Sequence, residues 1–148
     1  MKNNKKGEIV SIAVSEKKGV PKTVINSVKV IENHGIEDDA HAGFPKRQVS
    51  FLSSESINIA KDEGLDVSYG DFAENFATKG IEWKELPLGT MVNIGDSVVV
   101  EITQIGKECH NRCAIYYQAG DCIMPKEGIF GTVIKGGEVS VGDNILIS

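Results

Sequence analysis

The sequence contains no apolar run close to the roughly 20 residues that a membrane-spanning helix needs. Residues 1–6 are basic, but a short strand-like run follows them in place of the uninterrupted apolar stretch of a secretory signal. Positive charge is also scarce, because 16 Lys and Arg residues stand against 21 Asp and Glu, for a net charge of −5. Broad affinity for nucleic acid needs a concentration of positive charge. We therefore expect a cytoplasmic protein that binds neither membranes nor nucleic acid.

Cysteine is scarce, and its spacing disfavours two common uses. The three cysteines cannot all pair within one chain, and a reducing cytosol keeps them as thiols. A Cys-x-x-Cys pair is missing, which argues against a thioredoxin-type dithiol. Cys109, His110, Cys113 and Cys122 offer the four ligands of a structural zinc site, but their spacing suits such a site poorly. The roles that remain for the cysteines are packing and thiol chemistry.

No linker, low-complexity tract or change of composition divides the 148 residues, so a single domain over 1–148 is expected. Runs rich in β-branched residues, bounded by turn formers, predict strands. The predicted strands are 7–15, 23–31 and 48–52.

One helix is predicted with Ser53 or Ser54 as its N-cap, residues 55–63 as its body and Gly64 as its stop. Residues 33–46 combine glycines, a proline, histidines and acids, which indicates an exposed loop with no regular element. Residues 65–89 show no sustained hydrophobic periodicity, so no helix or strand is predicted there.

Residues 92–99 and 139–146 share the pattern V-x-[I/V]-G-D-x-[V/I]-[V/L]. In each copy a short alternating strand meets a Gly-Asp turn and continues as a second apolar strand. Sharp reversals at glycine are what a small barrel needs at its corners. The alternative is two unrelated turns that both favour Gly-Asp. We predict a mostly-β, barrel-like fold with one or two short helices.

The segment "GKECHNRCAIYYQAGDCIMPKEGIFG" holds all the cysteines. Lys107, His110 and Arg112 surround Cys109 and Cys113, and neighbouring cations favour the thiolate, which is both the nucleophile and the metal-binding form. A reactive or ligating cysteine is therefore the sharper hypothesis. The alternative is that these thiols are small buried side chains, which fits Cys122 best.

Two further groups of residues suggest binding chemistry. The loop "ENHGIEDDAHAGFPKRQVS" offers acids and histidines for a metal site, although acids in such loops are more often solvated turn formers. Cations at Lys46, Arg47 and Lys22 suit an oxyanion or a phosphate. In "YGDFAENFATKGI", Glu74 and Asn75 stand between apolar residues, which indicates polar groups aimed at a specific partner or a simple turn at a strand edge. The candidate metal ligands of the loop are His34, Glu37, Asp38, Asp39 and His41.

Four blocks of the sequence together carry a resemblance. "GIEDDAHAG…RQVSFL", "GDFAENFATKGI", "LPLGTMVNIGDSVVVEITQIGKECHNRCAIY" and "GDCIMPKEGIFGTVIKGGEVSVGD" look like successive blocks of the MOSC domain, named for the C-terminal domain of molybdenum cofactor sulfurases. The resemblance runs from about Gly7 to the C-terminus, in the expected order. It is closest to the short, stand-alone bacterial members.

The resemblance implies a strand-rich barrel that handles sulfur or the molybdenum cofactor, molybdopterin. A family cysteine is proposed to carry sulfur for delivery, or to ligate molybdenum. The Arg112–Cys113 pair resembles the Arg-Cys of amidoxime-reducing relatives, which makes Cys113 the first candidate for catalysis and for the metal. The spacing from Gln104 to Cys109 resembles the Gln-x-x-x-x-Cys of another branch. Cys122 is peculiar to the short branch, and its role stays open.

The same resemblance implies roles for other residues. The cofactor's phosphate would be held by cations, its pterin by polar side chains, and the thiolate by neighbouring positive charge. A sulfur donor such as a cysteine desulfurase, or a molybdoenzyme, would be the partner. A non-catalytic barrel that binds an anionic pterin or a partner enzyme is the alternative. The implied cofactor-binding residues are Lys22, Asp39, His41, Arg47, Asn75, Lys107, Arg112 and Lys126.

Overall fold

The computed structural model describes most of the chain, from the first strand to the last. The described residues are 6–15, 22–37, 39, 42–43, 48–62, 64, 69–70, 72, 74–106 and 128–147.

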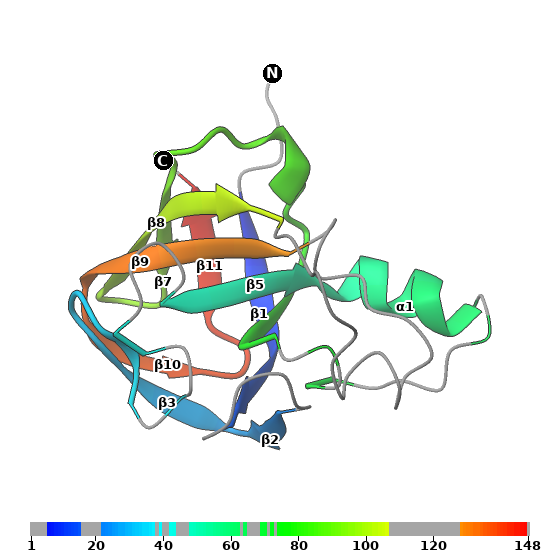
Figure 1. Ribbon diagram of the computed structural model, residues 1–148, viewed down its shortest axis with the longest axis horizontal. Helices are drawn as coiled ribbons and strands as arrows, with labels where there is room; N and C mark the ends of the chain where they lie inside the picture. Colours follow the sequence, from blue (N-terminus) through cyan, green and yellow to red (C-terminus); the bar gives the residue numbers. More distant parts are fainter. Residues whose placement is uncertain are drawn as a thin grey trace.

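Within the described residues, seven strands close into a barrel, so the predicted mostly-β barrel is confirmed (Figure 1). Around the wall the order is β1, β11, β7, β8, β9, β5 and β6, and β6 pairs again with β1. Neighbours are antiparallel except β5 and β6, which are parallel. The bounds are β1 Lys6–Val14, β5 Val49–Ser53, β6 Phe76–Lys79, β7 Met91–Ile94, β8 Val98–Ile105, β9 Ile129–Lys135 and β11 Asn144–Ile147.

The barrel is closed by the two ends of the chain. Lys6 of β1 pairs with Leu146 of β11, and Glu8 pairs with Asn144. At its other end β1 pairs with the short strand β2, Thr23–Ile25. The first and last strands are therefore direct neighbours in the wall.

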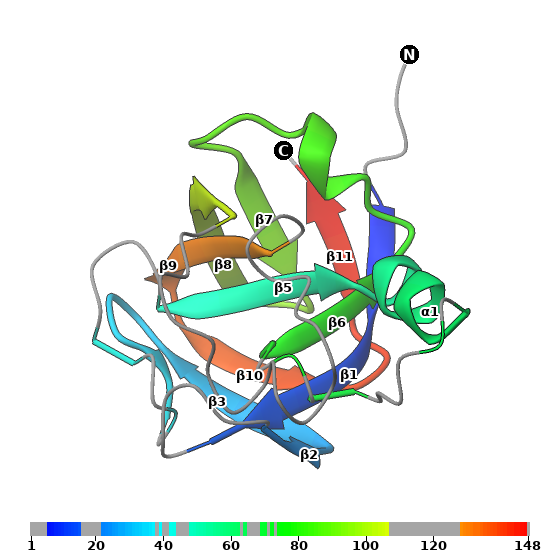
Figure 2. The same cartoon turned by 45° about the vertical axis from the view of Figure 1, so that its right-hand side comes forward.

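A second sheet packs against the barrel and shares its core. It consists of β3, Ser27–Ile31, between β10, Gly137–Ser140, and β4, Gly35–Ile36. Figure 2 shows β3 and β10 below β9 and β5. Val28, Val30, Ile36 and Val139 of this sheet belong to the same hydrophobic cluster as the inner residues of the wall. The sheet thus closes off apolar surface that the barrel would otherwise expose.

Two predictions for this region are wrong. Residues 23–31 form two strands rather than one, because the chain passes at Asn26 from the wall to the second sheet, where the Asn26 carbonyl accepts the N–H of Val141. No glycine or proline marks this break, and β-branched residues stand on both sides of it. Residues 33–46 contain strand β4, which pairs with β3 and is too short for a sequence period.

The barrel core contains a group of neighbouring aromatic rings. The ring of Phe51 lies 4.8 Å from that of Trp83 and 5.4 Å from that of Phe76, measured between centroids. The indole N–H of Trp83 donates to the Thr78 hydroxyl at 2.8 Å, so its one polar group is satisfied inside the core. Trp83 starts a single 3-10 turn, Trp83–Glu85, within the stretch that had no predicted element.

The predicted repeat is confirmed as two strand–turn–strand units that lie side by side. The first unit joins β7 to β8 and the second joins β10 to β11, and β7 pairs with β11. The N–H of Gly95 in the first turn donates to the Asn144 carbonyl beside the second turn at 2.9 Å. Gly95 and Gly142 both have positive φ, which explains glycine in both copies.

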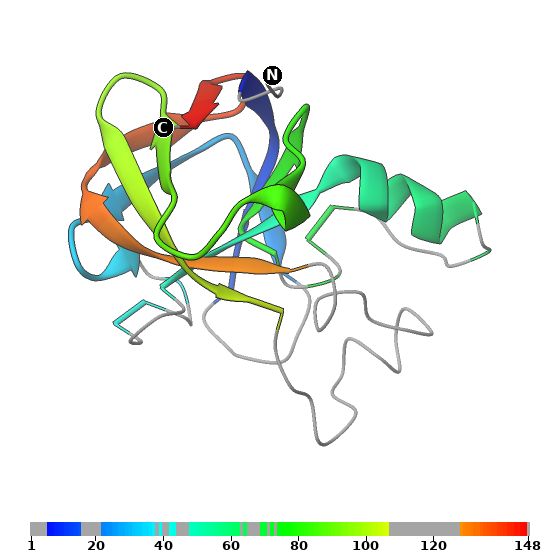
Figure 3. The same ribbon diagram turned by 90° about the horizontal axis from the view of Figure 1, so that it is seen from above.

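The predicted helix is also confirmed, as α1, Ser54–Asp62. The Ser53 hydroxyl accepts the N–H groups of Glu55 and Ser56, so Ser53 is the N-cap, and Gly64 follows the helix at a φ of 103°. Figure 3 shows α1 extending outward from the end of β5. The helix contacts β5 and β6, and its buried Ile57 does not belong to the hydrophobic cluster of the barrel core.

The start of α1 supplies a pH-dependent contribution to stability. Burial disfavours the charged form of Glu55, but hydrogen bonds from the Ser53 hydroxyl and the Gly80 N–H outweigh it and lower the Glu55 pKa below 4.5. A lowered folded-state pKa gives stability that is present above the unfolded value and is lost as the pH falls through the folded one. We expect Glu55→Gln to cost roughly 0.5 kcal/mol at pH 7 and less at pH 3, since the side chain is exposed. Urea unfolding at both pH values measures this, and an equal cost at both would contradict it.

Candidate functional site

Apart from the candidate metal ligands of the acidic loop, three of the predicted catalytic and cofactor-binding residues fall within the described part of the chain: Lys22, Asp39 and Asn75. All three are buried, and they lie where β1 ends and β6 begins. The candidate cysteines and the other predicted cofactor-binding residues lie outside the described residues, so their roles stay predictions. They are Cys109, Cys113, Cys122, His41, Arg47, Lys107, Arg112 and Lys126.

Asn75 joins two strands of the wall through its side chain. Its Oδ1 accepts the Ser50 N–H at 3.0 Å and the Ser50 hydroxyl at 3.2 Å, while its Nδ2 donates to the Ala13 carbonyl at 3.1 Å. Its backbone N–H donates to the Ser50 hydroxyl, and its carbonyl accepts the Ala13 N–H. The amide thus takes the place of a peptide group of β6 between β1 and β5, just before β6 begins.

Lys22 and Asp39 were both predicted to contact a cofactor, and in the structure they contact each other. The Lys22 ammonium lies 2.7 Å from Asp39 Oδ1, and neither side chain has exposed surface. The same oxygen accepts the Ser15 N–H at 3.0 Å. The pair therefore ties the loop at residue 39 to the end of β1 and the start of β2. A bound anion would reach the Lys22 ammonium only after this pair opens.

A second set of hydrogen bonds links this ion pair to the residues before β6. The Lys22 N–H donates to the Gly70 carbonyl at 2.7 Å, and the Gly70 N–H donates to Glu74 Oε2 at 2.6 Å. Glu74 is 1% exposed and directly precedes Asn75. Glu74 and Asn75, which interrupt the apolar pattern of "DFAENFATKG", therefore both hold other parts of the chain: Glu74 binds Gly70, and Asn75 binds β1 and β5. The sequence indicates that Glu74 and Asn75 have a specific role, but it does not indicate one for Ser50, because a serine inside a strand is common.

Residues paired across neighbouring strands lead from Asn75 to the base of the cysteine segment. Ser50, bound by Asn75, pairs with Phe130 of β9, and Phe130 pairs with Gln104 of β8. Neighbouring strands are about 4.8 Å apart, so three steps cover about 15 Å along the sheet. Figure 2 shows β9, β5 and β6 following one another in this way. Two residues after Gln104, the Gly106 N–H donates to the Gly128 carbonyl and closes the base of the segment 107–127.

The proposed metal site in the acidic loop gains no support from its described members. His34 and Glu37 are exposed, whereas Asp39 is buried in its ion pair with Lys22. Across the described residues there is no group of three or more His, Cys, Asp or Glu side chains placed to hold a metal ion. Asp38 and His41 lie outside these residues.

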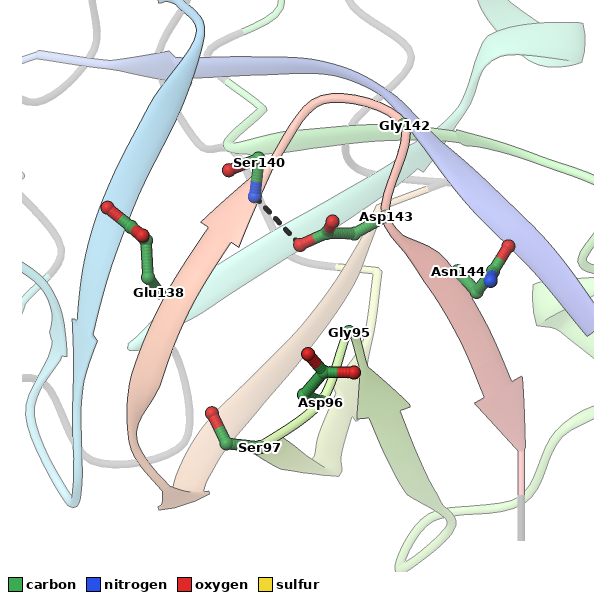
Figure 4. Close-up of a pocket in the computed structure, with 8 residues that line it drawn as sticks. All are labelled: Gly95, Asp96, Ser97, Glu138, Ser140, Gly142, Asp143 and Asn144. Atoms are coloured by element: carbon green, nitrogen blue, oxygen red, sulfur yellow. Dashed lines mark hydrogen bonds between the residues drawn. The ribbon is translucent and has the colours of Figure 1, made fainter.

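A pocket of about 470 Å³ lies elsewhere, between the two repeat turns (Figure 4). Three carboxylates line it, those of Asp96, Glu138 and Asp143, and Asp143 Oδ2 accepts the Ser140 N–H at 2.9 Å. The second turn is tied to β1 at Ile9, about 13 Å along the strand from Ala13 and hence from Asn75. This acidic pocket is therefore distinct from the predicted site, and it suits an anionic cofactor poorly.

Comparison with known proteins decides the family. The family model described as the MOSC domain matches residues 38–146, which is most of the chain. The chain belongs to the MOSC domain family. No curated protein matches it significantly in sequence.

Solved structures share the MOSC barrel. The YuaD protein from Bacillus subtilis superposes with a TM-score of 0.80 at 19% identity, over 96% of this chain and 95% of that one. YiiM from Geobacillus stearothermophilus gives 0.73 at 21% identity, over 96% and 75%. YiiM from Escherichia coli gives 0.66 at 18% identity, over 95% and 69%. At these identities the likeness establishes the fold. Among the described helices of this MOSC protein, none is long and apolar enough to cross a membrane.

The residues predicted from the sequence to meet a cofactor are of the types that a thiophilic metal and a phosphate prefer. Thiolates are the protein ligands that soft, thiophilic metals prefer, and lysine and arginine suit a phosphate. The described residues on their own form a frame of paired groups rather than a cradle, since Lys22 and Asp39 bind each other and Asn75 binds two strands. The described residues therefore do not themselves offer free groups for a cofactor, and the other predicted cofactor-binding residues lie outside the described part.

Proposed function

We propose that this MOSC protein handles sulfur or the molybdenum cofactor through one cysteine thiolate, with Cys113 as the first candidate and Cys109 as the second. Family membership is the observation that carries the proposal. The composition of the segment supports it, because Lys107 and Arg112 stand beside these two thiols in the sequence and cations favour thiolate. The buried frame of Lys22, Asp39 and Asn75 supports it as well. This frame stiffens the barrel wall about 15 Å along the sheet from Gly106, where the cysteine segment begins, and a stiff wall helps to hold a reactive group in place.

As a sulfur carrier, the thiolate would act as a nucleophile. It attacks the outer sulfur of a donor persulfide, a new S–S bond forms on the protein cysteine, the donor's S–S bond breaks, and the donor leaves as a thiolate. No external oxidant or reductant is needed, because the sulfane sulfur is only transferred. A cysteine desulfurase is a donor of this kind, and a molybdoenzyme is an acceptor.

As a cofactor-binding protein, the same thiolate would face molybdenum. When bound, molybdopterin supplies a thiophilic metal that takes a cysteine ligand, for which Cys113 is proposed. Arg47 and Lys126 would hold the phosphate, and His41 would meet the pterin. Lys107 and Arg112 would keep the thiol ionised. Lys22, Asp39 and Asn75 would support this site from beneath, since their polar groups are already engaged within the protein.

A non-catalytic barrel is the alternative, and the fully paired buried frame fits a rigid binding module equally well. Such a module would bind the cofactor or a partner in a fixed ratio, yet carry no sulfane sulfur. Intact mass after incubation with a persulfide donor separates the two: a gain of one sulfur on a single cysteine favours the carrier. Elemental analysis of the purified protein distinguishes the carrier and the binding module from a structural zinc protein, because only the last would contain zinc.

Cysteine variants test the proposal directly. We expect Cys113→Ser to lose most of the bound molybdenum and pterin, or of the bound sulfane sulfur, because a serine hydroxyl stays protonated at neutral pH and is a poor soft-metal ligand. Cys109→Ser tests the second candidate in the same way. Cys122→Ser is the matched control, with the same change in the same segment, and should retain both loads. Full retention in Cys113→Ser and Cys109→Ser would remove the cysteine role.

A further inference from the structure

We propose that the groove between α1 and the 3-10 turn is a docking site for an exposed arginine side chain of a partner protein. The groove has a volume of about 250 Å³, and none of the predicted cofactor-binding residues lines it. Pockets for drug-sized ligands measure roughly 300–1,000 Å³, so this groove suits a single side chain. The residues that matter for the proposal are Glu55, Ile59, Ile81, Glu82, Trp83 and Lys84.

The two walls of the groove follow neighbouring strands. α1 begins directly after β5, and residues 80–85 follow β6. Because β5 and β6 are parallel, both segments leave the same end of the wall. Glu55 Oε2 accepts the Gly80 N–H at 3.1 Å, and Glu55 Oε1 accepts the Ser53 hydroxyl at 2.7 Å, so a hydrogen bond joins the two walls. Figure 3 shows the 3-10 turn beside the start of α1. The groove is therefore a fixed feature of the fold.

The apolar part of the groove suits the stem of a long side chain. Ile81 and Trp83 are 5% and 3% exposed and form its floor, whereas Ile59 is 59% exposed and forms part of its rim. The Trp83 ring is held in place, because it stacks on Phe51 and its indole N–H donates to the Thr78 hydroxyl. Arginine and lysine bury their methylene stems along such surfaces and keep the charged head in water.

The polar part of the groove selects the head group. Glu55 stands on one wall and Glu82 on the other, and Lys84 is the single cation of the lining, so the net charge of these three groups is −1. In the part of the chain that the structure describes, the Glu82 carboxylate makes no hydrogen bond or ion pair. A guanidinium has five N–H donors in one plane and can serve two carboxylates, whereas an ammonium is a point charge. Arginine is also enriched at protein interfaces.

The test titrates the whole protein with N-acetyl-arginine amide at about 0.15 M salt, where exposed charges are well screened. Trp83 is the only tryptophan of the chain, so its indole N–H gives a single NMR signal beside the groove. We expect this signal to shift with a dissociation constant on the order of 1 mM, the range for a ligand of this size. N-acetyl-citrulline amide and N-acetyl-leucine amide, which lack the charge, should bind at least about threefold more weakly.

Substitutions in the groove test its two parts. Glu82→Gln removes a carboxylate without breaking a capping hydrogen bond, and we expect it to weaken binding of the arginine probe about threefold. Ile59→Ser should weaken it about fourfold, the effect of losing roughly one buried methylene. Glu85→Gln is the matched control, because it removes the same charge from the same 3-10 turn outside the groove. It should change binding by less than about 1.5-fold, since salt screens that charge.

Thermal unfolding of each variant identifies any loss of binding that reflects a loss of structure. The proposal is overturned if the Trp83 signal does not move at about 20 mM of the arginine probe, well above the expected dissociation constant. It is equally overturned if the citrulline, leucine or lysine amide binds as tightly as the arginine amide. Equal weakening by Glu82→Gln and Glu85→Gln would show a general effect of net charge and would also reject the site.

Discussion

Asp39→Ala is expected to lower the free energy of unfolding by about 3–5 kcal/mol, because it leaves the buried Lys22 ammonium without its carboxylate. The two groups are 2.7 Å apart and both side chains lack exposed surface, so water does not replace the lost partner. The change also removes the acceptor of the Ser15 N–H. Urea unfolding, followed by tryptophan fluorescence of Trp83 in the core, measures the loss.

The control is a double replacement that removes both charges. Lys22→Met combined with Asp39→Leu fills a similar volume with apolar groups, and buried ion pairs replaced in this way are often neutral or more stable. We therefore expect the double variant to be more stable than Asp39→Ala alone. If it is less stable than the single variant, the cost does not come from an unpaired buried charge. If Asp39→Ala costs less than about 1 kcal/mol, the pair behaves as an exposed one.

Asn75→Asp is expected to cost about 3–5 kcal/mol at neutral pH, the range for an uncompensated buried charge. The introduced carboxylate would keep the contacts with Ser50, but it would face the Ala13 carbonyl, an acceptor, where Asn75 Nδ2 now donates. Burial and this acceptor both raise the pKa of the new group. A raised folded-state pKa gives stability that is present at low pH and is lost as the pH rises through it. The cost should therefore be smaller at pH 4 than at pH 8.

Asn93→Asp provides the matched comparison. Asn93 also donates to a backbone carbonyl, but at the barrel surface, where water hydrates the introduced charge. Its cost should stay within about 1 kcal/mol at both pH values. An Asn75→Asp variant that matches Asn93→Asp, or whose cost is the same at pH 4 and pH 8, would show that the Asn75 amide does not bridge β1 and β5 as described.

Much of the fold follows from local sequence signals. The two Gly-Asp repeats predicted the paired corners of the barrel, because a turn at positive φ between alternating strands is encoded within about eight residues. Ser53 and Gly64 predicted both ends of α1 for the same reason. The break at Asn26 was missed, since its cause is a distant contact with Val141 and a change of sheet. Strand β4 was missed because two residues carry no period.

The structure tests the placement of three predicted site residues, and their roles stay predictions. Lys22, Asp39 and Asn75 were identified from their chemistry, and the structure gathers them near the end of β1. No sequence pattern indicates that Lys22 and Asp39 bind each other, because a contact across 17 positions depends on how the chain between them folds back. Gln104 was noted for its spacing to Cys109, whereas its bond to Gly106 depends on a bulge that the sequence does not reveal.

Two separate sets of hydrogen bonds hold the loops near the predicted site. Buried, mutually paired polar groups hold the loops at the ends of β1 and β6, and the clamp at Gly106 and Gly128 holds the base of the cysteine segment about 15 Å away along the sheet. Rigid support of this kind is what precise placement of a nucleophile or metal ligand requires. The acidic pocket between the repeat turns is separate from this arrangement.

The most direct test of the proposed thiolate chemistry is the pH dependence of alkylation at each cysteine. A free thiol titrates with a pKa of about 8.5, and flanking cations lower that value. Cys113 or Cys109 should react with a midpoint below about 7.5, in the range of activated thiols, and faster at pH 7 than Cys122. Midpoints at or above about 8.5 for both Cys113 and Cys109 would contradict a role for either thiol as a sulfur carrier or molybdenum ligand.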